Sequence, residues 1–146
     1  MPVFFSFAQV REDLAKHTAG LEPAQIWRTI GANSLGFQLK HIAGSVDRIT
    51  SYLMKQPLTD AQMAFLRQES SGSEDIPALL ELVNANLSHS EDRLRQLDPN
   101  SIYEARSVGR RALPTTVIGL LVHLAEHTQR HLGQAITLSR LARQPG

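Results

Sequence analysis

The histidines of this 146-residue chain offer the clearest chemistry, because three of the six stand four residues apart. They are His123, His127 and His131, in the run VHLAEHTQRHLGQ. Residues four apart share one helix face at about 6 Å between Cβ atoms, so two such imidazoles can bind one cation at ~2.0–2.1 Å. The outer two are roughly 12 Å apart along a helix axis and cannot share an ion. The spacing therefore predicts a metal pair of His127 with either His123 or His131.

Such a pair needs a third ligand from a facing helix, and His41 is the best candidate. It lies in the middle of a second apolar-patterned segment, directly before Ile42, which belongs to the buried stripe of that segment. An unpaired imidazole at the edge of a core costs free energy unless it finds a partner. Three histidines leave coordination positions open, which is typical of catalytic sites that activate water or a thiol.

Each of these residues also has a simpler interpretation. Histidines four apart on a helix are as often polar surface residues or hydrogen-bonded core residues. His17 and His89 are expected at the surface with no further role. Arg106, Arg110 and Arg111 are expected to be solvated, although they could bind an anionic group of a ligand.

Apolar periodicity predicts the helices that must position the histidines. The segment around His41 carries apolar residues at alternating spacings of four and three, namely Leu35, Leu39, Ile42, Val46, Ile49 and Leu53. Similar stripes predict three further long helices, and no useful length of chain alternates as a strand would. The expected long helices cover residues 2–18, 35 to before Pro57, about 75–97 and 114–143, with short helices over 23–30 and 59–67.

The connections and helix ends complete this all-α prediction. Thr59 followed by Gln62 resembles a capping box, and Ser90 is a polar residue within the apolar stripe of the third long helix. Residues 100–113 show no clean period and form the longest irregular connection. The sequence therefore predicts a four-helix bundle with short extra helices and a long crossover before the last helix.

Composition excludes several classes of function. The chain has no cysteine, so it forms no disulfide, no cysteine zinc cage and no thiol nucleophile of its own. Its 15 Lys and Arg against 14 Asp and Glu give a net charge of +1, far from a nucleic-acid-binding balance. No apolar run suits a membrane span or signal peptide. We expect a single domain over residues 1–146, located in the cytoplasm, with no nucleic-acid or membrane partner.

Two stretches carry a resemblance to a known family. SLGFQLKHIAGSVDRITSYL around His41 and HTQRHLGQAITLSRLAR from His127 together resemble the DinB-like superfamily of four-helix bundles, also called damage-inducible or YfiT-like. The second stretch contains the motif His-x-x-x-His-x-Gly-Gln on the terminal helix, which is fairly specific. The resemblance covers nearly the whole chain in the order of its elements.

The resemblance implies a metal triad of His41, His127 and His131. His123 then lines the pocket or packs one turn back, and Gln134 orients a ligand or bound water from the same helix face. Characterised relatives include transferases and isomerases that use bacillithiol or mycothiol, in which a zinc-type ion lowers the pKa of the thiol. Members commonly form homodimers, which the resemblance implies here as well. Apolar residues such as Phe4, Phe5 and Phe65 could provide the interface, although burial in the core would explain them equally well.

The leading hypothesis is therefore an enzyme that depends on Zn²⁺ or Ni²⁺. It would act as a transferase or hydrolase, with a low-molecular-weight thiol or water attacking a small electrophilic substrate. The residues indicate no further catalytic group. The alternative is a non-enzymatic, stress-related binding or interaction module in which the metal only braces two helices.

Overall fold

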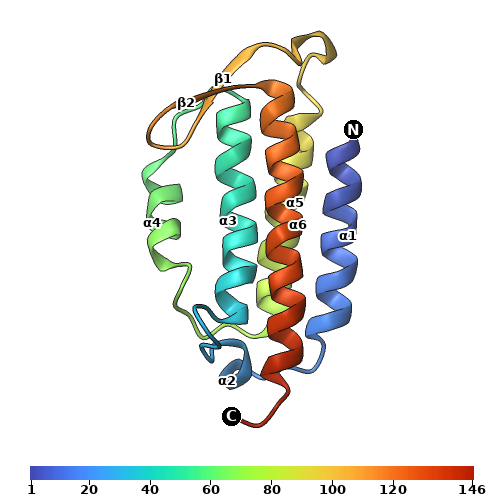
Figure 1. Cartoon of the computed structure of the whole chain (residues 1–146), viewed down its shortest axis with the longest axis vertical. Coiled ribbons are helices and arrows are strands. Elements are labelled where there is room, and N and C mark those ends of the chain that lie inside the picture. The colour runs from blue at the N-terminus through green and yellow to red at the C-terminus, as the bar shows by residue number, and fades with distance from the viewer.

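The computed structural model describes residues 1–146, and four long helices packed side by side dominate it (Figure 1). One cluster of 25 buried apolar side chains fills the space between them. Phe7, Leu39, Leu87 and Leu124, one from each long helix, have no exposed surface. The predicted all-α four-helix bundle is thus confirmed. Its long helices are α1 (Pro2–Thr18), α3 (Leu35–Leu53), α5 (Ile76–Leu94) and α6 (Val117–Ala142).

Side-chain caps begin the helices close to the predicted positions. Ser34 caps α3 and Asp75 caps α5, each accepting a hydrogen bond from a backbone N–H of the first turn. Thr59 and Gln62 form the predicted capping box at the start of α4 (Asp60–Gln68), with both reciprocal hydrogen bonds present. These local bonds satisfy backbone donors that the helices themselves leave free.

The connection between α3 and α5 determines how the helices align. It returns along the outside of the bundle, carrying α4 beside α3, so that α3 and α5 run in the same direction (Figure 1). This alignment places the hydroxyls of Thr50 and Ser90 2.6 Å apart inside the bundle. The polar position in the apolar stripe of α5 is therefore hydrogen-bonded, as a buried hydroxyl must be.

Two predictions for the ends of helices were wrong. The short helix predicted over 23–30 is one turn, α2 (Pro23–Ile26), because the chain leaves it at Trp27, whose indole N–H donates to the carbonyl of Glu74 at 3.0 Å. The last helix begins at Val117 and not at Pro114. Proline lacks an N–H, which suits an exposed short strand as well as a first helical turn.

Pro114 belongs to a β-hairpin that the sequence pattern did not predict. Strands β1 (Ala105–Val108) and β2 (Leu113–Thr116) pair antiparallel, with Ser107 opposite Pro114. This hairpin, which connects α5 to α6 in the sequence, extends across the end of α3 toward the side of α4 (Figure 1). Four-residue strands are too short to show a clear alternation. The turn also needs positive φ at Gly109 (+76°) and Ala112 (+47°), of which only the glycine is a turn signal.

Arg106 anchors this hairpin, which contradicts its expected solvation. Its side chain is only 6% exposed, and Nε donates a 2.7 Å hydrogen bond to the carbonyl of Leu53 at the end of α3. A cation there also interacts favourably with the negative end of the helix dipole. The arginine therefore joins the crossover to the helix that carries His41.

The phenylalanines proposed for an interface differ in exposure. Phe5 is 81% exposed, whereas Phe4 packs against the core with the guanidinium of Arg95 over its ring, and Phe65 is a half-buried residue of α4. Of the three, only Phe5 is a largely exposed apolar side chain. No helix in the structure has both the length and the apolar character needed to cross a membrane.

Candidate metal centre

Three histidine rings converge between α3 and α6. The ring centroid of His41 lies 4.3 Å from that of His131 and 5.2 Å from that of His127, and the two α6 rings are 4.5 Å apart. One ring nitrogen from each residue lies within 4.8 Å of the other two. Nitrogen atoms that bind one ion at about 2 Å are roughly 3–4 Å apart, so small side-chain rotations would let the three residues hold one metal ion.

The histidines outside this cluster occupy different surroundings. His123 lies one turn before His127, with its ring centroid 5.5 Å away and Nδ1 3.9 Å from the carboxylate of Glu126. His89 is exposed on α5, and His17 is half-buried at the far end of α1. Only the combination of one α3 ring and two α6 rings meets the distances of a metal site.

Hydrogen bonds determine which nitrogen atoms remain free on two of the rings. Nδ1 of His41 is 2.7 Å from the carboxylate of Glu69, and Nδ1 of His131 is 2.7 Å from the side-chain carbonyl oxygen of Gln38. Both oxygens can only accept, so each Nδ1 is the donor, and in the neutral tautomer of either ring Nε2 is the nitrogen that carries the lone pair. This is the protonation state that a metal-binding imidazole requires.

His127 is the third ring that could bind the ion, and one of its nitrogen atoms has no hydrogen-bond partner. Its Nδ1 is buried and has no hydrogen-bond partner, which costs free energy unless a bound ion or water satisfies it. Burial, followed by the neighbouring His131 and His41, lowers the pKa of His127 to about 4. Burial and His41 lower the pKa of His131 to about 4 as well. Both rings are therefore neutral near pH 7, and the donor set fits a divalent cation.

Glu69, which the sequence analysis missed, orients His41 from the end of α4. Its side chain is 2% exposed; one carboxylate oxygen accepts from His41, and the other accepts from Arg48 at 2.8 Å. Burying a carboxyl group costs free energy that such hydrogen-bond and ionic partners offset. The sequence held one indirect signal, since Arg48 lies seven residues after His41 on the same face of α3 and a buried arginine needs an acid. No feature of the sequence near Arg48 indicated that this acid would be Glu69.

A second buried interaction fixes the segment that carries Glu69. The ammonium of Lys40 donates to the backbone carbonyl of Ser71 at 2.8 Å and pairs with Glu74 at 2.7 Å. It also lies 5.0 Å from the ring centroid of Trp27. The chain just after Glu69 is thus held against the helix turn that precedes His41.

Gly44 makes the Glu69 and Arg48 pair sterically possible. A Cβ atom at this position would lie 2.7 Å from Nη1 of Arg48 and closer still to Oε1 of Glu69. Gly133 on α6 is a matched helical glycine, since a Cβ there would meet nothing within 4 Å. Comparing the same substitution at the two glycines therefore distinguishes a steric requirement at Gly44 from the ordinary effect of glycine on helix stability.

Alanine at these two positions should change stability in opposite directions. Gly44→Ala is expected to lower the free energy of unfolding of the metal-free protein by about 1–3 kcal/mol through overpacking. Gly133→Ala is expected to raise it by up to about 1 kcal/mol, because alanine favours a helix over glycine. Urea denaturation followed by circular dichroism measures both. A stabilised Gly44→Ala variant would contradict the packing described here.

Gln134, proposed to orient a ligand, reaches the cluster through another residue. Its side-chain oxygen accepts a 2.8 Å hydrogen bond from the amide of Gln38, whose own oxygen is bonded to His131. The hydrogen bonds therefore run from Gln134 through Gln38 to His131, and Gln38 is the residue in contact with the ring. Gln38 is buried on α3 one turn before His41, so α3 contributes both a ring and the orientation of a second ring.

A cavity of about 260 Å³ lies beside two of the three rings. Rings of His41, His123 and His127 form one side of it. Apolar side chains of α3, α4 and the loop before α4 form much of the rest, namely Ile49, Leu58, Met63 and Leu66. Arg110 of the hairpin also lines it. A small molecule in this cavity would contact the imidazoles directly.

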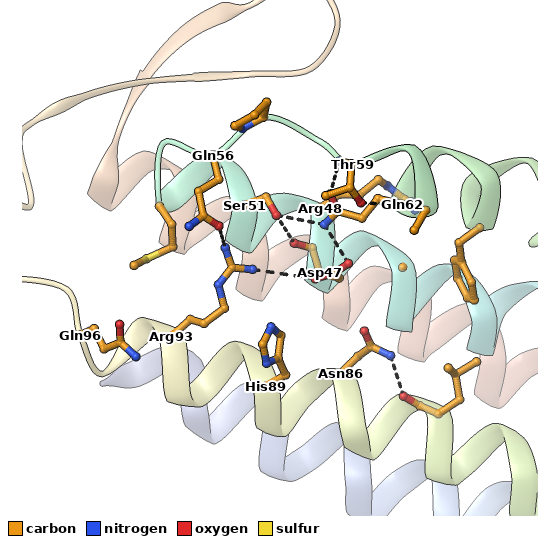
Figure 2. Close-up of a pocket in the computed structure, with 16 residues that line it drawn as sticks. Asp47, Arg48, Ser51, Gln56, Thr59, Gln62, Asn86, His89, Arg93 and Gln96 are labelled. Carbon is orange, nitrogen blue, oxygen red and sulfur yellow. Dashed lines mark hydrogen bonds and ion pairs between the residues drawn. The ribbon is translucent and has the colours of Figure 1, made fainter.

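The largest cavity is elsewhere and has a different character. A groove of about 710 Å³ lies between α3, α4 and α5, and its polar side chains largely bond one another (Figure 2). Asp47 accepts from Gln62 at 2.8 Å, and Arg93 donates to Gln56. No ring of the triad lines this groove, so size alone does not identify the reactive site. Arg48 lines both cavities and separates them.

Fold and site together define a class of protein: a four-helix bundle with a three-histidine cluster shared by α3 and α6. The chain belongs to the DinB superfamily, whose sequence model matches residues 6–135, and the predicted resemblance is thereby confirmed. The fold is similar to a solved structure described as a conserved protein from Enterococcus faecalis. The TM-score is 0.77 at 16% identity, over 96% of this chain and 94% of that one. No curated protein matches the sequence significantly.

Proposed function

We propose that this protein is a divalent-metal-dependent enzyme in which His41, His127 and His131 hold Zn²⁺ or Ni²⁺. The nucleophile would be a low-molecular-weight thiol or water, and the reaction a transfer to, or hydrolysis of, a small electrophile. The observation that carries this proposal is the cavity beside the triad, because two of the three rings face space that a substrate can enter.

The protein's own groups supply orientation and exclusion of solvent in this proposal. A divalent cation held by three imidazoles would lower the pKa of a thiol or water bound to it. Glu69 and Gln38 accept hydrogen bonds from Nδ1 of His41 and of His131, which orients both rings and would leave Nε2 of each for an ion. Since the chain has no cysteine, a thiol nucleophile must come from a cosubstrate.

The alternative is a binding or stress-related module with a structural metal. It is supported by the origin of the ligands, because an ion between α3 and α6 would cross-link two helices of the bundle. Such an ion stabilises the folded state by an amount that grows with the logarithm of its concentration relative to Kd, about 4 kcal/mol at a thousand times Kd. A stabilising metal alone therefore does not separate the two functions.

Turnover by metal-loaded protein is the test. Protein purified without an affinity tag would first be analysed for zinc, nickel, copper and iron. It would then be offered bacillithiol, mycothiol or glutathione with a panel of electrophiles, and separately a panel of activated esters. We expect turnover that EDTA abolishes and added metal restores. A sharp fall in melting temperature on chelation, with no product from any panel, would instead support the structural role.

A further inference from the structure

The cavity beside the triad combines apolar walls with a complete lack of carboxylates. Ile49, Leu58, Met63 and Leu66 offer hydrocarbon surface, and no Asp or Glu is among the residues that line it. Small-molecule sites typically have such walls with a few polar groups that orient the ligand. The polar groups here therefore indicate which ligand is favoured.

Two arginines line the cavity, and only one of them is free to bind a ligand. Arg48 is buried and its charge is compensated by Glu69 at 2.8 Å. The guanidinium of Arg110 is exposed and makes no hydrogen bond or ion pair with another side chain or with the backbone. A guanidinium presents several donors in a planar arrangement that matches a carboxylate. The cavity thus has one uncompensated positive charge at its edge.

The hairpin holds this charge in place over the cavity. Arg110 follows Gly109, which also lines the cavity and has a φ of +76°, in the turn between β1 and β2. Arg106 ties β1 to the end of α3 through its bond to Leu53, which fixes the base of the hairpin. Tyr52, on α3 below the turn, adds a phenol that makes no hydrogen bond within the chain and lines the same cavity.

We infer that the cavity binds a small organic carboxylate, with Arg110 pairing with the anion and the apolar body lying against Ile49 and Met63. This inference rests on the proposed function, because it names the class of substrate that would reach the triad. The volume of about 260 Å³ is below the roughly 300–1,000 Å³ of pockets for drug-sized ligands, which favours a small body such as a single aromatic ring. The electrophilic centre of such a substrate would lie on the side of His41 and His127.

Benzoate and its neutral analogue benzamide provide the test. Binding of each to zinc-loaded protein would be measured by isothermal titration calorimetry, with wild type, Arg110→Gln and Arg111→Gln. Arg111 is the matched control, being the adjacent exposed arginine, equally free of partners but outside the cavity. Charge-assisted hydrogen bonds at a partly exposed site should make benzoate bind about tenfold more weakly to Arg110→Gln. Arg111→Gln should bind it as wild type does.

Outcomes for this inference and for the proposed function can be told apart. Equal benzoate binding by the two arginine variants, or benzamide binding as tightly as benzoate, would overturn the carboxylate subsite. Zinc content is measured on the same samples. If the wild type retains no zinc, the metal-dependent function fails. The same comparison of the two variants in metal-free protein then decides the subsite independently.

Discussion

Alanine at His41, His127 or His131 is expected to remove stoichiometric metal from the protein, whereas alanine at His123 should leave metal content unchanged. Each of the three residues contributes one ligand atom, and two imidazoles alone form a weak site. The loss of affinity should exceed the roughly 10–100-fold typical of changing a residue that only orients a ligand. His123 is the stringent control, because its spacing from His127 equals that of His131.

The metal-free variants should remain folded, which keeps this prediction informative. His127 leaves a buried nitrogen without a partner, so its removal deletes an unfavourable feature along with the ring. Competition with a chromophoric chelator would give the zinc affinity of each variant, and thermal unfolding in EDTA would show that each still folds. Full zinc retention by all three folded variants would refute the triad.

Glu69→Gln is expected both to weaken metal binding and to lower the stability of the protein. The substitution keeps the size of the side chain but removes the charge that faces His41 and Arg48. Loss of a carboxylate behind a metal-binding imidazole typically costs 10–100-fold in affinity. Arg48 would remain buried without its counter-ion, which costs about 3–5 kcal/mol in comparable buried pairs.

Glu74→Gln provides the matched control for this prediction. Glu74 lies on the same connecting segment and pairs with Lys40 at 2.7 Å, but it contacts none of the three histidines. Its replacement should lower stability without changing zinc affinity, which separates a general loosening of the segment from a direct effect on His41. Zinc affinity that falls equally in both variants would show that Glu69 acts only through stability.

The helices could be predicted from local patterns because their determinants are local. The stripe of α3 and the capping box of Thr59 with Gln62 act within a few residues, and the structure has both as predicted. The start of α6 was placed three residues early. Pro114 is compatible with either a strand or a helix, and only pairing with β1 decides between them.

Arg106 makes a contact that no local sequence pattern could predict. An arginine in a segment without period is most simply read as solvated, yet this one is buried against the carbonyl of Leu53, 53 residues earlier in the chain. Its neighbour in the turn, Arg110, is free and faces a cavity. The two have the same chemistry and lie four residues apart, so their different roles arise from the packing of the hairpin.

The sequence by itself determined that α6 could bring two imidazoles to one face and that His41 would lie at the edge of a buried stripe, because helical periodicity relates residues a few positions apart. Only the tertiary structure decided that these faces meet, and that Glu69 and Gln38 orient the rings. Such contacts join segments 28 and 93 residues apart. They depend on the register and rotation of the helices relative to one another. The apolar pattern does not specify these, because apolar side chains can fill a core in many arrangements of the same helices.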